Sequence, residues 1–265
     1  MSATRMPAAA GRFYPDDPAA LSRVVRGLLD AAAMHQPPES SPPKAIVVPH
    51  AGYAFSGPIA ASAYARLLPF RRAIRRVVLL GPAHFVNLEG LAASAAAEFE
   101  TPLGQVLVDL EAIEDVLRLP QVCVADGAHS REHSLEVHLP FLQSVLSDFR
   151  IVPLVAGRAA PEAVAQVIER LWGGPETLFV VSTDLSHYHD YETAVRLDRE
   201  TSRAVEELRA ADLRGDRACG YVPLGGLLTV ARAHGLRVRT VDLRNSGDTA
   251  GPRDQVVGYG AYVVE

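Results

Sequence analysis

The chain has 265 residues, of which 48% are hydrophobic and 22% are charged, a composition that excludes disorder throughout. The formal net charge of −5 argues against a nucleic-acid-binding protein. No apolar run approaches the roughly 20 residues of a membrane span. The N-terminus lacks the apolar stretch of a signal peptide, and two cysteines cannot build a disulfide scaffold. We therefore expect a cytoplasmic protein that contacts neither nucleic acid nor membrane.

The organisation along the chain predicts one domain over residues 1–265. Residues 1–43 are expected to comprise an N-terminal arm, a helix and a Pro/Ser-rich linker, which is Gln36–Pro43. This linker lies too near the N-terminus to separate two domains.

Short apolar segments rich in β-branched residues predict strands that are covered on both faces. They are Lys44–Val48, Arg76–Leu80, Arg150–Val155 and Thr177–Ser182, with further candidates at Gln105–Val108, Leu236–Leu243 and Gln255–Val264. Glycines in the last segment favour a bent strand or one at the edge of the sheet.

Helical patterns alternate with these strands. They are Pro58–Leu68, Ser134–Leu146, Pro161–Leu171, Tyr191–Leu208 and Pro223–Ala233. Ser56 and Gly57 are placed to cap the first helix, and Pro140 is expected to kink the second. The alternation predicts a three-layer α/β/α sandwich around a mainly parallel or mixed sheet.

Three histidines occupy the same local position. His50, His84 and His187 each follow a predicted strand by a few residues. Because the carboxyl ends of parallel strands form the ligand crevice of an open α/β sheet, the three imidazoles are expected to converge there. Imidazole is the commonest metal ligand and the usual acid or base near neutral pH, so convergence would make a metal or acid–base site. The alternative is that each is an ordinary hydrogen-bonded loop residue.

A second polar cluster runs from Asp126 to His138. His133 and Glu136 are expected near the first turn of a helix, pointing into the crevice; the alternative is ordinary N-capping. The segment His129–His133 also matches the H-x-x-E-H zinc-protease string. That chemistry needs the string inside a helix, whereas the preceding residues predict a turn.

Two further loops offer candidate ligands. Asp248 follows a predicted strand and would complete, with two histidines, the facial triad of non-haem iron(II) oxygenases; the alternative is an Asx turn. The segment Tyr53–Pro58 offers backbone N–H groups at a helix start to an anionic substrate, with Tyr53 and Ser56 as substrate-binding residues. An ordinary N-cap is the alternative there. Cys123 and Cys219 are expected to be buried packing residues.

Motifs spread in order from Gly11 to Tyr259 resemble the Memo family, whose prokaryotic members are called AmmeMemoRadiSam system protein B. They are Gly11–Pro15, Val48–Tyr53 with Ser56–Gly57, Gly81–His84, Thr101–Gly104, Glu132–Glu136 with Leu139–Phe141, Ser182–His187, Cys219–Gly220 and Val257–Tyr259.

The resemblance implies a fold like that of the class III extradiol dioxygenases, which are non-haem iron(II) enzymes that open catechol rings. His50 and His84 match the metal-ligand histidines of that pattern. His187 matches the histidine that serves as acid or base, and Asp184 lies on the same loop.

The sequence departs from the animal members at the third ligand, where a cysteine is expected in the loop before the last strand. Here Thr249 stands at that place, next to Asp248. The departure favours Fe(II) over copper, with copper or zinc as alternatives. Asp248 is the candidate third ligand, and His187 and Glu136 are the alternatives.

The resulting hypothesis is a metal-binding, dioxygenase-like oxidoreductase for a phenolic or catecholic small molecule. His187 would move the proton, oriented by Asp184, while His133 and Glu136 would line the pocket. One alternative is a non-enzymatic adaptor that binds a peptide or ligand in the same crevice, and another is a metal-dependent hydrolase. The family name also implies a pathway link to a radical SAM enzyme.

Overall fold

The computed structural model describes residues 4–34 and 41–265, so most of the expected linker Gln36–Pro43 lies outside the described residues. The strands are β1 (Thr4–Arg5), β2 (Ala45–Val48), β3 (Arg76–Pro82), β4 (Leu91–Ala93), β5 (Glu98–Thr101), β6 (Gly104–Leu107), β7 (Val122–Val124), β8 (Arg150–Ala156), β9 (Thr177–Ser182), β10 (His187–His189), β11 (Val238–Asn245) and β12 (Val256–Val264).

Nine strands form one mixed sheet in the order β10-β12-β2-β9-β3-β8-β4-β7, with β11 also paired to β12. Its centre is parallel, because β9 pairs in parallel with both β2 and β3, and β3 pairs in parallel with β8. The carboxyl ends of β2, β3 and β9 therefore lie next to one another. A small second sheet has the order β1-β5-β6.

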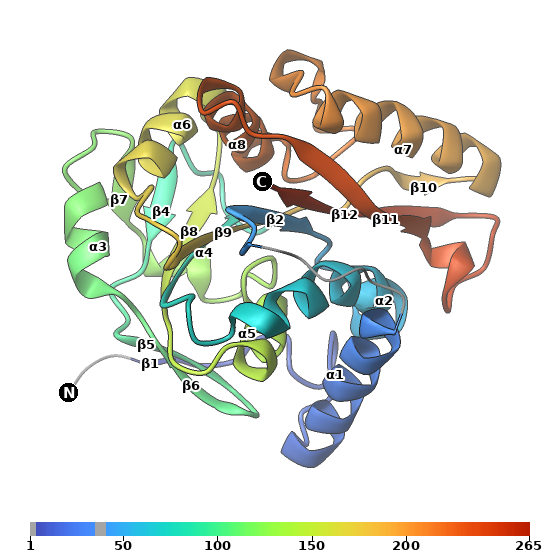
Figure 1. Cartoon of the computed structure of the whole chain (residues 1–265), viewed down its shortest axis with the longest axis horizontal. Coiled ribbons are helices and arrows are strands. Elements are labelled where there is room, and N and C mark those ends of the chain that lie inside the picture. Colours follow the sequence, from blue (N-terminus) through green and yellow to red (C-terminus); the bar gives the residue numbers. More distant parts are fainter. Residues whose placement is uncertain (1–3, 35–40) are drawn as a thin grey trace.

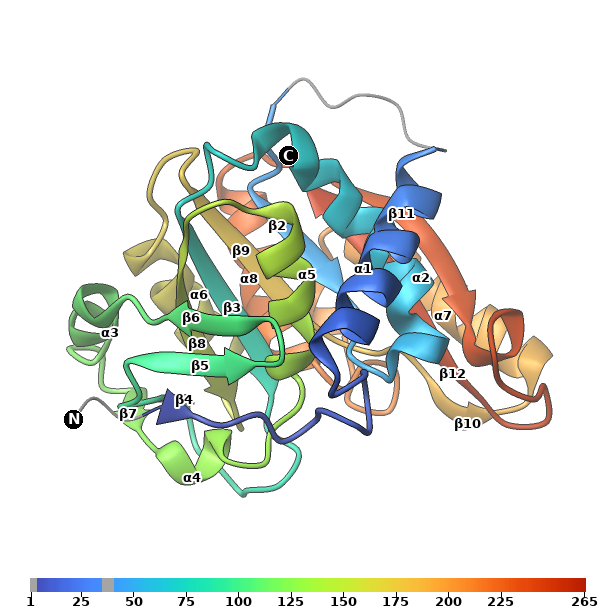
Figure 2. The same ribbon diagram turned by 90° about the horizontal axis from the view of Figure 1, so that it is seen from below.

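Helices cover both faces of the large sheet (Figure 1). They are α1 (Pro18–Ala33), α2 (Tyr53–Tyr64), α3 (Leu110–Val116), α4 (Asp126–His129), α5 (Leu139–Val145), α6 (Pro161–Arg170), α7 (Tyr191–Glu206) and α8 (Tyr221–Ala233), with 3-10 turns at Ala65–Phe70, Glu136–His138, Ala210–Asp212 and Ser246–Asp248. Helices α1, α2 and α5 lie together on one face (Figure 2), and α6, α7 and α8 lie on the other. The predicted three-layer α/β sandwich is confirmed.

The predicted strands are found with small changes in their ends, but the prediction of an edge position for the last strand is wrong. β12 lies inside the sheet, between β2 on one side and β10 and β11 on the other. Its glycines serve a close approach instead, because a Cβ at Gly258 would lie 2.0 Å from Asp198 Oδ2. This carboxylate also accepts the backbone N–H of Ser186, in the loop before His187, at 3.0 Å.

Two local helix predictions are wrong. Helix α2 begins at Tyr53 with Gly52 as its N-cap, so Ser56 and Gly57 lie inside it, and the Ser56 hydroxyl donates to the Ala51 carbonyl. Pro140 does not kink a long helix. It lies in the first turn of α5, where its missing N–H costs nothing, after a separate 3-10 turn.

The core is one cluster of buried apolar residues that runs from the N-terminal arm to β12. Arg5, on β1, is buried against the segment before α5, where it pairs with Glu136 and donates to the carbonyls of His129 and Glu132. Among the described residues, no helix is both long and apolar enough to cross a membrane.

Candidate metal centre

Three histidines meet at the carboxyl end of the central strands. His50 follows β2, His84 follows β3, and His133 lies in the segment between α4 and the 3-10 turn before α5. One ring nitrogen from each lies within 4.8 Å of the others. The ring centroids are 5.1 Å apart for His50 and His84, 5.5 Å for His50 and His133, and 4.7 Å for His84 and His133.

Glu132 fixes the orientation of His84. Its Oε1 lies 2.8 Å from His84 Nδ1, and its Oε2 accepts the His84 backbone N–H at 2.7 Å. Burial would raise the pKa of Glu132, but these bonds and those from nearby backbone N–H groups lower it overall to about 2. An ionised carboxylate on Nδ1 leaves His84 Nε2 as the nitrogen for a metal.

His50 is held from two sides. Its backbone N–H donates to Asp184 Oδ1 at 2.7 Å, and its Nδ1 lies 2.6 Å from Ser182 Oγ. Because Nδ1 is engaged in this way, Nε2 is the ring nitrogen left for the cluster. Burial raises the pKa of Asp184, against the effect of the hydrogen bond from His50.

The residues fit a transition metal. Burial lowers the pKa of both His50 and His133, with the neighbouring imidazoles adding to the effect. Both rings are therefore neutral near pH 7, as ligation requires. His133 Nδ1 is buried and makes no hydrogen bond, and the nearby Glu132 Oε1 lies 3.4 Å from it. His84 and His133 have side chains 27% and 17% exposed, so the cluster opens to solvent on their side.

The sequence-predicted residues divide into two groups. His50 and His84 come together, and His133 joins them as a third candidate ligand instead of lining the pocket. His187 lies near enough for its charge to lower the pKa of His50 and of Asp184. It is outside the three-histidine group of the described chain.

The other predicted residues are held elsewhere. Asp248 does not join the cluster, because its carboxylate accepts the Asn245 backbone N–H in a capping box and, separately, the Tyr191 hydroxyl. Glu136 does not face the crevice, because it is fully buried and accepts from Arg5 and from the Tyr14 hydroxyl.

Neither predicted substrate-binding side chain reaches the surface. Tyr53 is 5% exposed and donates its hydroxyl to the Val137 carbonyl, and Ser56 is 2% exposed. The zinc-protease string forms no continuous helix either, since α4 ends at His129.

Cys219 lies beside the candidate metal centre, although the sequence predicted only a packing role for it. Its Sγ lies 3.3 Å from His50 Nε2, and burial raises the pKa of the thiol to about 12. The only sequence signal was the Cys219–Gly220 motif of the family resemblance. The packing role predicted for Cys123 is wrong, because that residue is exposed.

Exposed aromatic side chains follow the site residues closely in the sequence. Among the described residues, four aromatic side chains are at least 38% exposed: Phe55, Phe85, Tyr188 and Tyr221. We call these four the aromatic rim. Each follows His50, His84, His187 or Cys219 by one to five positions.

A pocket of about 200 Å³ opens next to Cys219. Its lining mixes apolar side chains with polar groups, and besides Cys219 it consists of Pro82, Ala83, Val86, Asn87, Leu88, Ala156, Gly157, Arg158, Tyr221 and Val222. Since Pro82 and Ala83 directly precede His84, the pocket adjoins the candidate metal centre.

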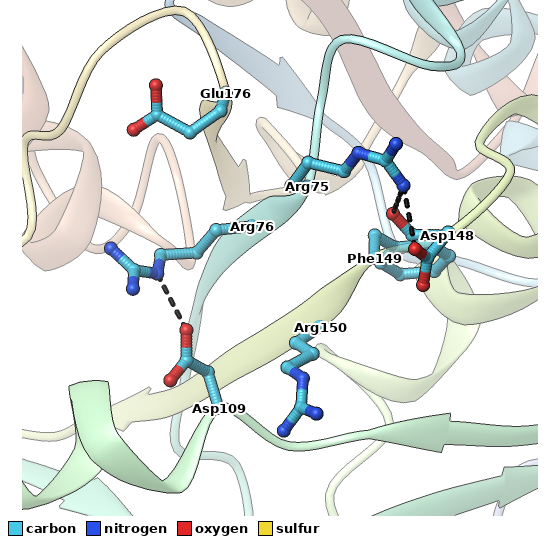
Figure 3. A pocket seen from close by; sticks show the side chains of 7 residues that line it. All are labelled: Arg75, Arg76, Asp109, Asp148, Phe149, Arg150 and Glu176. Carbon is cyan, nitrogen blue, oxygen red and sulfur yellow. Dashed lines mark hydrogen bonds and ion pairs between the residues drawn. The ribbon is translucent and has the colours of Figure 1, made fainter.

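A different hollow, of about 310 Å³, lies at the opposite ends of the strands (Figure 3). It is lined by Arg75, Arg76, Asp109, Asp148, Phe149, Arg150 and Glu176. It carries three guanidinium groups and three carboxylates, and two pairs are joined at 2.7 and 2.8 Å. The formal charges of its lining side chains balance.

The fold and the site define an α/β protein with a three-histidine centre at the carboxyl ends of parallel strands. The model of the Memo-like protein family matches residues 5–263, so the chain belongs to this family.

Relatives match over almost their whole length. A MEMO1 family protein of Aquifex aeolicus is 38% identical, and one of Sulfolobus acidocaldarius is 32% identical; each match covers 96% of this chain and 97% of the relative. Among solved structures, an uncharacterized protein of Escherichia coli K12, JW3007, matches with a TM-score of 0.49 and 12% identity, over 82% of this chain and 98% of that one.

Proposed function

We propose that the chain is a non-haem iron protein with dioxygenase-like chemistry, in which His50, His84 and His133 hold the metal. The observation that carries this proposal is the trio of imidazoles whose nitrogens lie within 4.8 Å of one another. Three imidazoles suit Fe(II), copper or zinc, and the resemblance to the extradiol dioxygenases favours Fe(II). Bound Fe(II) would supply open coordination positions and redox chemistry for oxygen.

The proposed substrate is a phenolic or catecholic small molecule. The pocket of about 200 Å³ beside Cys219 has the size for one aromatic ring, and the apolar side chains of Val86, Leu88 and Val222 form part of its lining. The exposed rings of Phe85 and Tyr221 can stack against such a molecule. We assign the proton transfer to His187, whose imidazole lies within electrostatic range of the buried Asp184.

Metal binding is the first test. Substitution of His50, His84 or His133 by Ala is expected to lower Fe(II) affinity under anaerobic conditions by at least about 100-fold, since each removes one of three ligands. His234→Ala is the matched control, because His234 pairs with Glu169 and stacks on Trp172 outside the cluster. Retention of wild-type affinity by the three site variants would remove the proposed centre.

Turnover is the second test. Iron-loaded protein is expected to consume oxygen with a member of a catechol panel, and His187→Ala is expected to keep the iron and lose the activity. Peptide binding that survives chelation and the histidine substitutions would instead identify an adaptor. Hydrolysis that continues without oxygen would identify a hydrolase.

A further inference from the structure

His50 lies in a chain of hydrogen bonds that runs through both of its ring nitrogens. On one side, Nδ1 lies 2.6 Å from Ser182 Oγ, and this hydroxyl lies 2.9 Å from His138 Nε2. On the other side, Nε2 lies 3.3 Å from Cys219 Sγ. His50, Ser182 and His138 are all at most 2% exposed, so water does not compete for these bonds.

At each end of this series of hydrogen bonds is a backbone group whose role as donor or acceptor is fixed. At one end, the Asp184 backbone N–H donates to Cys219 Sγ at 3.2 Å. At the other end, burial lowers the pKa of His138, so the ring is neutral, although a hydrogen bond to the backbone of Ser134 opposes this shift. A bond with that effect is donated by the ring to a carbonyl, and Nδ1 is the nitrogen left to donate it.

The positions of the hydrogens follow from these ends. A neutral His138 that donates through Nδ1 has an acceptor at Nε2, so the Ser182 hydroxyl donates to it. Ser182 Oγ then accepts from His50, which places the His50 proton on Nδ1. His50 Nε2 is left with its lone pair.

The hydrogen bonds of Cys219 lead to the same proton positions on His50. Cys219 Sγ accepts the Asp184 backbone N–H at 3.2 Å and lies 3.3 Å from His50 Nε2, so its S–H can donate to that nitrogen. The other possible acceptors lie farther from Sγ: the Thr183 hydroxyl at 3.9 Å and the Asp184 carbonyl at 3.7 Å. That carbonyl already accepts from the Thr183 hydroxyl at 2.7 Å.

We propose that Ser182 and His138 are positioning residues, which hold His50 as the tautomer that presents its Nε2 lone pair to the metal. Neither residue belongs to the three-histidine cluster, and both act through the His50 ring. This inference rests on the proposed metal centre. The opposite tautomer carries a proton on Nε2 and cannot ligate through that nitrogen, so its population would weaken binding.

The tautomer can be measured without any metal. In metal-free protein labelled with ¹⁵N-histidine, at about pH 8 where imidazoles are neutral, the ring-nitrogen shifts distinguish a protonated from an unprotonated nitrogen. A His50→Gln sample assigns the signals. We expect the His50 proton on Nδ1 in the wild-type protein, and a proton on Nε2 would overturn the inference even if no variant folds.

Variants then test the positioning role, with Zn²⁺ as the probe. Ser182→Ala is expected to release the His50 tautomer and to lower Zn²⁺ affinity by roughly 10- to 100-fold. His138→Gln is expected to stay within about threefold of wild type, because the amide oxygen accepts from Ser182 and the amide N–H replaces the donor. Ser202→Ala is the control, because its buried hydroxyl bonds Thr240 away from the histidines.

Two results with these variants would also contradict the proposal: Ser182→Ala that binds Zn²⁺ as tightly as Ser202→Ala, or His138→Gln that loses as much affinity as Ser182→Ala. A wild-type protein that binds no metal would refute the proposed function alone. The tautomer measurement would still confirm or refute the hydrogen-bond chain.

Discussion

Charged side chains are exposed to solvent at one end of the central strands and buried at the other. At the amino ends of β3, β8 and β9, which we call the arginine end, charged side chains form solvent-exposed salt bridges. The Arg75 and Asp148 side chains, for example, are 51% and 85% exposed. At the carboxyl ends, which we call the histidine end, the carboxylates of Glu132, Glu136 and Asp184 are buried and bonded to rings or backbone N–H groups.

Because of this difference, the positions of the imidazoles depend on the buried carboxylates and not on the exposed salt bridges. Exposed pairs at the arginine end are screened by water and can be exchanged with little effect. Buried carboxylates at the histidine end are not screened by water, so they fix the positions of the imidazoles around them. The comparison predicts that single substitutions at the histidine end have much larger effects than matched ones at the arginine end.

The largest expected effect comes from Arg5. Arg5→Ala leaves the buried Glu136 carboxylate without its cation, and loss of one partner of a buried pair costs about 3–5 kcal/mol. The matched change, Arg75→Ala, breaks an exposed pair and is expected to cost less than about 1 kcal/mol. Urea unfolding of both variants measures the contrast, and equal losses would show that burial does not distinguish the two ends.

Acid should act on the histidine end through His129. Burial lowers the pKa of this side chain to about 4, although a hydrogen bond to the Ala92 carbonyl opposes the shift. Because the folded pKa lies below the unfolded one, the stabilisation is present above about pH 6.5 and is lost as the pH falls toward 4. The loss is expected to reach roughly 3 kcal/mol.

His129→Gln isolates this contribution, since the amide can keep the bond to the Ala92 carbonyl but does not titrate. The variant is expected to lose less stability than wild type between pH 7 and about 4, the window in which His129 titrates. Parallel pH profiles of unfolding free energy for the two proteins would contradict the assignment.

The sequence predicted the fold well because its strands are continuous β-branched runs, which need no partner to be recognised. It also predicted His50 and His84, since their places are set by the strands they follow. His133 could not be assigned as a ligand, because its ring position depends on contacts of its segment with Glu132 and with the distant Arg5.

The same physical limit explains the residues that do not join the cluster. Glu136 is drawn away from the crevice by Arg5, which is 131 positions distant in the chain. Asp248 was predicted from its place after a strand, but a local capping box satisfies its carboxylate. Partners far along the chain decide the first case, and short-range turn chemistry decides the second.

The smallest expected effect concerns backbone strain beside His187. Tyr188 has φ 60° and is 71% exposed, so a bulky residue stands in a left-handed conformation with little packing to hold it. Tyr188→Asn is expected to stabilise the fold by about 0.5–1 kcal/mol, because asparagine tolerates this region. It should also weaken the binding of a catechol, because it removes one ring of the aromatic rim.

Tyr188→Phe separates the two effects. It keeps the ring and the strain, so both stability and catechol binding are expected to stay near wild type, whereas Tyr188→Asn changes them in opposite directions. Thermal unfolding and equilibrium ligand binding measure the two quantities. If Tyr188→Asn gains stability and binds a catechol as well as Tyr188→Phe, the strain beside His187 has no part in ligand binding. Opposite changes would mean that this end of the sheet gives up stability to hold a ring at its surface.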